Sequence, residues 1–262
     1  MTTVPATEIR RSAPPLGGFN LTFLGLEVRR MLRNRRTMVF TLIMPVAFFF
    51  LFGATSAAAK SESVGVGNRT AYVMISVAAY GAILATTSGG ANVSVERAQG
   101  WSRQLRLTPL HPVAYVAMKI ATAMVLGLLA SAIVFVVGRA SGARIPTEDL
   151  LVAFVICWLG AVAFAAFGLF MGYLLPSENV MQILGPVLAV LAFLGGLFVP
   201  LEFLGATFQT IAKFTPVYGL GELARHPLTH HALVVPALNI LAWTVLFAAG
   251  AALLFRRDTR RV

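Results

Sequence analysis

The chain has 262 residues, of which 58% are hydrophobic and only 12% are charged, and its formal net charge is +11. Average soluble domains carry about a quarter charged residues, so these polar residues are too few to cover a soluble protein of this length. The composition excludes a soluble domain and predicts an all-α integral membrane protein. Basic chains can also bind nucleic acid, but here Lys and Arg cluster at the ends of apolar runs, so we expect no nucleic-acid partner.

The region before the first apolar run divides into two parts. Residues 1–18 are rich in Pro, Thr and Arg, and we expect them to be disordered. Residues 19–36 carry apolar side chains at helical spacing, which predicts an amphipathic helix in the membrane interface with its basic face toward anionic lipid headgroups. The alternative is a solvated N-terminal arm. The charged residues of this interfacial helix are Glu27, Arg29, Arg30 and Arg33.

Six apolar runs follow, and a helix needs about 20 apolar residues to cross a bilayer. The first run ends in Ser and Ala residues like a signal-peptidase site, but the long basic region before it fits a signal peptide poorly. Small residues in the second run favour close helix packing over a ligand role. Residues 19–262 are therefore expected to form a single transmembrane domain. The predicted spans cover residues 37–59, 70–95, 113–138, 150–175, 183–199 and 232–255.

An even number of spans puts both termini on one side of the membrane. Fifteen of the 21 Lys and Arg residues lie before the first span, in the stretch 96–119 that contains the connector and ends at Lys119, or after the sixth span. Because positive residues concentrate on the cytoplasmic side, both termini and the connector between the second and third spans are predicted to be cytoplasmic. The turn at 176–182 would share this side, although it carries Glu178 and no Lys or Arg.

The connector at residues 96–112 is a charged stretch between two apolar runs. A short amphipathic helix fits most of it and ends at Thr108, because the residue before a proline is pushed out of the α region. A stiff charged connector is a place where a partner protein can push on the membrane helices. We expect Glu96 and Arg97 to face water in this docking element. Its candidate residues are Glu96, Arg97, Gly100, Arg103, Arg106 and Pro109.

Residues 200–231 are too polar to span a membrane and too apolar for an ordinary loop. Two prolines interrupt helix formation, and non-helical backbone at membrane depth needs protein or a water-filled cavity around it. We therefore predict short re-entrant helices, which form either an outer gate for substrate or a structural cap over the bundle. Two of the carboxylates, Glu202 and Glu222, are expected at the boundary with water. The candidate residues are Pro200, Glu202, Phe203, Pro216 and Glu222.

Several motifs are missing from the sequence. There is no G-x-x-x-x-G-K-[ST] stretch, so the chain does not bind ATP by that route. No Asp, Glu, Lys or Arg is expected deep within a span, where ion-driven transporters carry ionisable groups. No catalytic residue is expected, and no metal site either, because His230 and His231 lack a third ligand at suitable spacing.

Three stretches together resemble the ABC-2 type membrane permeases of ATP-binding-cassette exporters. The resemblance runs from about Leu24 to the C-terminus, and its Thr-Pro-Leu pattern is more similar to drug and antibiotic exporters than to polysaccharide exporters. One departure is Gly205 after Leu204, where family members often have Leu-Pro. The stretches are 27–36 with Met44 and Pro45; Glu96, Arg97, Gly100 and 107–110; and 196–202, 211–216 and 222–225.

This resemblance implies a fold and a set of partners. The fold has six transmembrane helices, an N-terminal interfacial helix, a cytoplasmic coupling helix after the second span, and short re-entrant helices between the fifth and sixth. The partners are a separate P-loop ATPase subunit, which binds ATP and magnesium, and a second permease copy or paralogue, with membrane lipid around them. The chain itself would bind no cofactor.

The expected function is export of a hydrophobic or amphipathic substrate, such as a drug, an antibiotic or a lipid-like molecule, across the plasma membrane. Two alternatives stay open. One is a permease of the same fold that exports a glycan or a lipid-linked polymer. The other is a membrane assembly or sensor protein that transports nothing and uses the connector only for docking.

Overall fold

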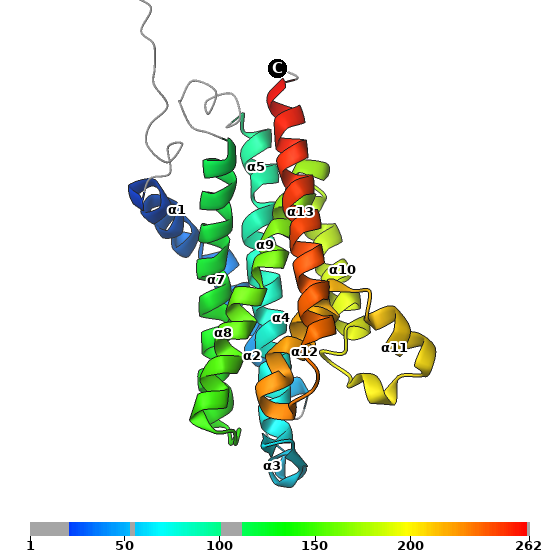
Figure 1. Ribbon diagram of the computed structural model, residues 1–262. Helices are drawn as coiled ribbons and strands as arrows, with labels where there is room; N and C mark the ends of the chain where they lie inside the picture. The colour runs from blue at the N-terminus through cyan, green and yellow to red at the C-terminus, as the bar shows by residue number, and fades with distance from the viewer. Residues whose placement is uncertain (1–20, 53–55, 101–111, 261–262) are drawn as a thin grey trace, which may run out of the picture.

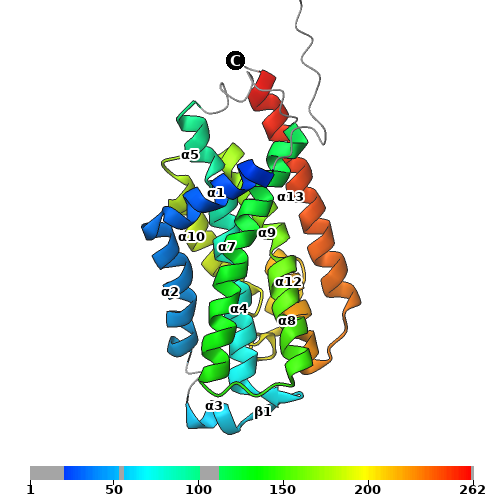
Figure 2. The ribbon, with the colours of Figure 1, turned by 90° about the vertical axis from the view of Figure 1, so that its left-hand side faces the viewer.

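The computed structural model describes residues 21–52, 56–100 and 112–260, and these form an elongated helical bundle (Figure 1). Most helices run along the long axis, whereas α1 (Leu21–Arg33) lies across it near one end (Figure 2). We call this the terminal end, because the last turns of α13 (Val234–Arg260) also lie there. The opposite end carries α3 (Ala57–Ser61) and a small strand pair. The two strands, β1 (Ser63–Val64) and β2 (Gly67–Asn68), pair antiparallel.

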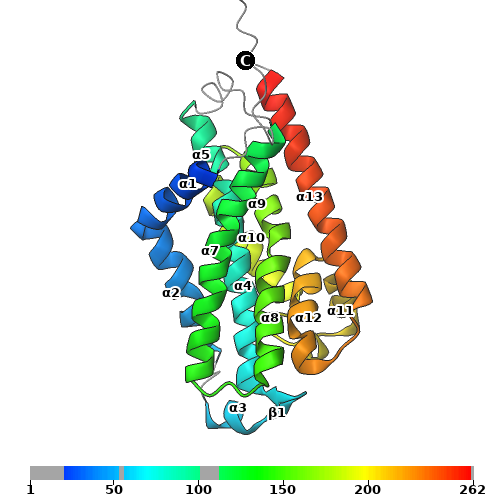
Figure 3. The ribbon, with the colours of Figure 1, turned by 60° about the vertical axis from the view of Figure 1, so that its left-hand side comes forward.

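The bundle is built around α4 (Arg69–Ala91), most of whose side chains are buried. It packs most extensively against α7 (Pro112–Ala140) and α9 (Val162–Leu174). Figure 3 shows it between α2 (Arg35–Leu51) and α13 at opposite edges of the bundle. Small residues permit this central position, since a Cβ on Gly90 or on Gly168 would clash with the backbone of the facing helix. The α4–α9 contact is therefore a backbone-to-backbone contact.

Four helical segments are long and apolar enough to cross a membrane by length and composition. They cover Arg69–Ala98, Ala114–Ala140, Thr147–Leu174 and Val234–Arg257. The apolar parts of α2 and of α10 (Val180–Leu194) are shorter, at Thr41–Leu51 and Gln182–Leu194. An all-α protein with several candidate spans is thus confirmed, and the count of six stays a prediction.

Several helix boundaries differ from the sequence prediction. The fourth predicted span is divided at Ala161 into α8 (Thr147–Gly160) and α9. The fifth ends at Leu194 instead of residue 199, because Gly196 has φ +76°, a conformation that suits glycine and ends the helix. The first apolar helix ends at Leu51, before the predicted residue 59.

The segment after α10 leaves the bundle and returns to it (Figure 1). It forms a 3₁₀ turn, η2 (Leu201–Phe203), then α11 (Ala206–Ala212) and α12 (Pro216–Thr229). Thr215 caps the start of α12, because its hydroxyl accepts a hydrogen bond from the Tyr218 amide. The helix itself begins with Pro216, at a position where a missing N–H has no cost. Helix α12 packs on α8 and α13. Its re-entry into the membrane stays a prediction.

Candidate functional site

Three charged side chains from three separate helices meet at the terminal end. The Lys119 ammonium of α7 lies 2.6 Å from Glu96 Oε1 of α5 (Val93–Ala98) and 3.0 Å from Glu27 Oε2 of α1. Glu96 is 5% exposed and Lys119 is 4% exposed. Buried charges are tolerated only when they are paired, so this arrangement ties α1 and α5 to α7.

Two further groups complete this cluster. The Tyr115 hydroxyl, one helical turn before Lys119, donates to Glu96 Oε2 at 2.8 Å. The Arg30 guanidinium lies 3.5 Å from Glu96 Oε1 and 3.7 Å from Glu27 Oε1. Two carboxylates therefore share one buried ammonium and one largely exposed guanidinium. We refer to Glu27, Arg30, Glu96, Tyr115 and Lys119 as the Lys119 cluster.

Arg97 joins α5 to a different neighbour. Its Nη1 donates to the carbonyl oxygens of Tyr173, at 2.9 Å, and Gly172, at 3.2 Å. These carbonyls belong to the last turn of α9, where backbone acceptors lack helical partners and a positive charge is favourable. The guanidinium also lies 5.5 Å from the centre of the Tyr173 ring. The start of the connector is thus fixed to α9 as well as to α1 and α7.

The expectation that Glu96 and Arg97 face water is wrong. Glu96 is buried against α7, and Arg97 is half-buried against α9. Lys119, counted with the connector charges from its place in the sequence, lies two turns into α7, and its ammonium is the partner that lets Glu96 be buried. A lone lysine near the start of an apolar run was the signal for this pairing.

The other predicted docking residues have mixed outcomes. Gly100 follows α5 with φ +77°, a left-handed conformation that glycine adopts readily. Arg103, Arg106 and Pro109 lie outside the described residues, so the coupling helix stays a prediction. On α1, Arg29, Arg30 and Arg33 are exposed, whereas Glu27 turns toward the bundle.

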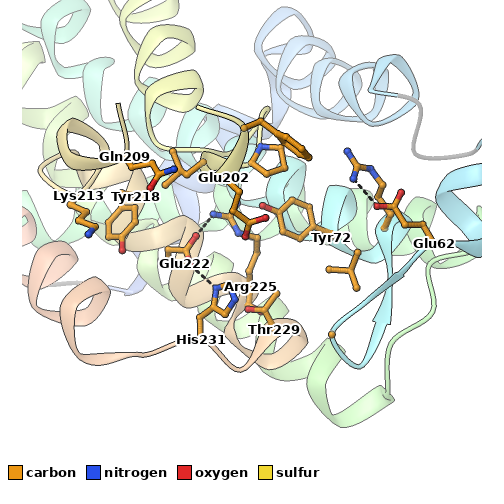
Figure 4. Close-up of a pocket in the computed structure, with 16 residues that line it drawn as sticks. Glu62, Tyr72, Glu202, Gln209, Lys213, Tyr218, Glu222, Arg225, Thr229 and His231 are labelled. Atoms are coloured by element: carbon orange, nitrogen blue, oxygen red, sulfur yellow. Dashed lines mark hydrogen bonds and ion pairs between the residues drawn. The ribbon is translucent and has the colours of Figure 1, made fainter. Parts of the chain in front are cut away.

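A second polar site lies toward the opposite end, where a cavity of about 420 Å³ opens between α4, η2, α11 and α12 (Figure 4). Its wall includes Arg225, which is 2% exposed although it carries a charge. Arg225 Nη2 contacts Glu222 Oε1 at 2.6 Å. Its Nη1 donates to Ser76 Oγ at 3.1 Å and to the Gly196 carbonyl at 3.0 Å. The guanidinium lies 5.1 Å from the Tyr72 ring centre.

Glu222 is held between two basic side chains. Besides Arg225, the His231 Nδ1 lies 3.3 Å from Glu222 Oε2. Burial disfavours the charged carboxylate, but the positive charge and hydrogen bond of Arg225, with the contact to His231, outweigh it, and the pKa of Glu222 is lowered from its usual 4.5. We refer to Tyr72, Ser76, Glu222, Arg225 and His231 as the Arg225 cluster.

The residues predicted for the outer gate are partly brought together here. Pro200, Glu202, Phe203 and Glu222 all line the cavity, and Pro216 is buried at the start of α12. Glu202 is exposed, as expected for a residue at the water boundary, but the Glu222 side chain is only 17% exposed. Arg225 is a further residue of this site that was not predicted from the sequence. Its place one helical turn after Glu222, at i and i+3, was the available signal.

Among the described residues, no group of three or more His, Cys, Asp and Glu side chains is arranged to hold a metal ion. His226 and His231 are joined through a contact of 2.6 Å between the His226 Nδ1 and the His231 carbonyl oxygen. His230 adopts a left-handed conformation with φ 56° at the end of α12. These histidines shape the α12–α13 turn.

Comparison with known proteins identifies the family. The sequence model of the ABC-2 type transporter family matches residues 21–228, which include the whole Lys119 cluster and all of the Arg225 cluster except His231. The chain belongs to this family. A relative is the protein of Bacillus subtilis (strain 168) named "Putative transport permease YvfS", which is 27% identical over 198 residues, covering 75% of this chain and 80% of the relative. The ABC-2 type chain described here is therefore a membrane component of a transporter.

Proposed function

We propose that this ABC-2 type chain is the permease subunit of an exporter driven by a separate P-loop ATPase. The observation that carries the proposal is the Lys119 cluster, which ties the interfacial helix α1 and the start of the connector to α7. A partner that moves the connector would move all three elements together. ATP and magnesium would be bound by that partner, because the sequence has no phosphate-binding loop of its own.

The cargo is proposed to be hydrophobic or amphipathic, such as a drug, an antibiotic or a lipid-like molecule. Supporting this, the spans carry few charges, and small residues line the helix contacts at which a pathway could open. A second copy of the chain, or a paralogue, would complete the pathway. The cavity at the opposite end would serve as the outer gate, reached by cargo after it leaves the bundle.

The first test is co-purification of the tagged chain from native membranes in a mild detergent. We expect an ATPase subunit with a phosphate-binding loop in stoichiometric amount, and ATP-dependent cargo movement when both are reconstituted in vesicles. The chain alone should hydrolyse no ATP. If no ATPase accompanies the chain under conditions that keep other transporter complexes intact, the exporter assignment fails and an assembly or sensor role replaces it.

The proposed orientation has both termini in the cytoplasm and the chain in the plasma membrane. The single native cysteine, Cys157, is fully buried, so a thiol reagent should label only cysteines that are introduced by mutation. Ser141→Cys, in the α7–α8 loop, should react with an impermeant thiol reagent added outside cells, and Gln99→Cys should not. Ser141 is preferred to Gly142 because Gly142 has a φ of +107°, at which the backbone of a cysteine would be strained. The reverse labelling pattern would invert the orientation.

A further inference from the structure

The cavity at the opposite end has a balanced set of charges, most of which are already paired. Three carboxylates and three cations line it. Glu62 pairs with Arg69 at 3.0 Å at the edge, and Glu222 pairs with Arg225 at 2.6 Å in the wall. These two pairs account for four of the six charges. The paired residues therefore give the cavity its shape and polarity, but little net attraction for a charged ligand.

One acid and one base remain, namely Glu202 and Lys213. Both are exposed, and neither makes an ion pair within the part of the chain that the structure describes. Figure 4 shows Lys213 beside Tyr218 and Gln209 at one side of the cavity, and Glu202 above the Glu222–Arg225 pair. Glu202 comes from η2 and Lys213 follows α11, so two separate elements present opposite free charges to one cavity.

We propose that this cavity binds the polar head of a zwitterionic amphiphile, with the ligand's ammonium toward Glu202 and its phosphate or carboxylate toward Lys213. The inference rests on the proposed export function in that it names the class of molecule received at the outer gate. A ligand with one charge would leave the second cavity charge without a partner, whereas a zwitterion satisfies both. Charge-assisted hydrogen bonds of this kind are roughly twice as strong as neutral ones.

The surroundings of the cavity favour a ligand with an apolar tail. Phe203 lines the cavity yet is 71% exposed. On the adjacent α11, Phe208 and Ile211 are exposed too, so large apolar side chains stand unburied beside a polar cavity. The volume of about 420 Å³ falls within the roughly 300–1,000 Å³ typical of small-molecule sites.

The cavity wall is held in place independently of the ligand. Arg225 fastens α12 to Ser76 on α4 and to the Gly196 carbonyl, and the Asn239 amide of α13 donates to the Lys213 carbonyl at 2.7 Å. The backbone beside Lys213 is also fixed by the Trp243 indole, which donates to the Phe214 carbonyl at 3.0 Å. A ligand would therefore meet a wall and a Lys213 backbone that are already in position, which lowers the ordering cost of binding.

The test uses three dodecyl probes that differ only in their heads: dodecyl phosphoethanolamine, dodecyl phosphate and dodecylamine. Binding to the purified full chain in uncharged maltoside micelles is measured by isothermal titration calorimetry. Wild-type protein should prefer the zwitterion over each singly charged probe by at least about tenfold, equivalent to about 1.4 kcal/mol. The double variant Glu202→Gln/Lys213→Gln lacks both free charges. Its titration is therefore the control for the heat of probe entry into the micelle.

The single variants separate the two charges. Glu202→Gln should remove the preference for phosphoethanolamine over phosphate, and Lys213→Gln should remove its preference over the amine. Glu62→Gln, which alters a paired acid lining the same cavity, should leave both preferences unchanged. Equal binding of all three probes to wild type, or preferences that survive the single variants, would overturn the inference. No ATP or partner is involved, so this result stands apart from the transport test of the exporter proposal.

Discussion

The two buried ion clusters of this ABC-2 type chain are built in opposite ways. In the Lys119 cluster, Glu27, Glu96 and Lys119 come from three helices, and the ion pairs themselves hold those helices together. In the Arg225 cluster, the ion pair joins residues three apart on α12, and Arg225 reaches other elements through Ser76, a backbone carbonyl and the Tyr72 ring. Charge thus joins three helices at the terminal end and fixes a cavity wall at the opposite end.

The largest expected effect comes from removing either central cation. Lys119→Met leaves two carboxylates from different helices without their buried ammonium, which should cost about 3–5 kcal/mol of unfolding free energy. It should also free α1, so hydrogen exchange in residues 21–33 should rise. Arg225→Met should destabilise the chain too, but exchange in α1 should stay unchanged. Unaltered α1 exchange in the Lys119 variant would remove the contrast between the clusters.

An effect of intermediate size is expected from variants of Glu27 and Glu96, which test whether the two carboxylates share the Lys119 ammonium. Glu27→Gln alone should cost little, because Glu96 keeps Lys119 paired at 2.6 Å. Glu96→Gln alone should cost more, since it also weakens the Tyr115 hydrogen bond. The double variant leaves the buried ammonium without a carboxylate partner. Its loss of unfolding free energy should exceed the sum of the two single losses by about 1–2 kcal/mol. Additive losses in detergent unfolding experiments would show that the carboxylates act separately.

The smallest effect concerns pH at the opposite end. Because the pKa of folded Glu222 lies below its usual 4.5, its charge contributes stability that is fully present above that value and lost as pH falls through the lowered pKa. Melting temperatures of wild type and Glu222→Gln should therefore differ at about pH 6, and the difference should shrink as pH falls below 4.5 through the lowered pKa. Glu62→Gln, in an exposed pair, is the matched control and should change stability by less than about 1 kcal/mol. A constant gap between wild type and the Glu222 variant would contradict this linkage.

The helices were largely predictable from the sequence, because apolar runs and helix-breaking prolines act over short distances. The interfacial helix expected at 19–36 is seen as α1 at Leu21–Arg33, and the third expected span at 113–138 as α7 at Pro112–Ala140. The break at Ala161 was missed because the residues on both sides are apolar helix formers, and only tertiary packing distinguishes α8 from α9.

The site residues were predicted less well, since their partners are distant in the chain. Glu96 and Arg97 have the composition of a solvated connector, and burial became possible only through Lys119, 23 residues later, and the end of α9. Similarly, Arg225 has charged neighbours typical of a loop, yet its bond to Ser76 spans 149 residues. The spacing of residues along the chain does not show which of these distant side chains pair in the fold.

The backbone contact at Gly90 and Gly168 has a mechanical consequence. It divides the span Arg69–Ala98 into two unequal arms, with Glu96 six residues from Gly90 on one side and Ser76 fourteen residues away on the other. At about 1.5 Å of rise per residue, these arms measure about 9 Å and about 21 Å. A rigid tilt about this fulcrum would turn a shift of about 1 Å at Glu96 into more than about 2 Å at Ser76, in the reverse direction. The span Arg69–Ala98 thus carries Glu96 on its short arm, and its long arm carries Ser76, which bonds to Arg225.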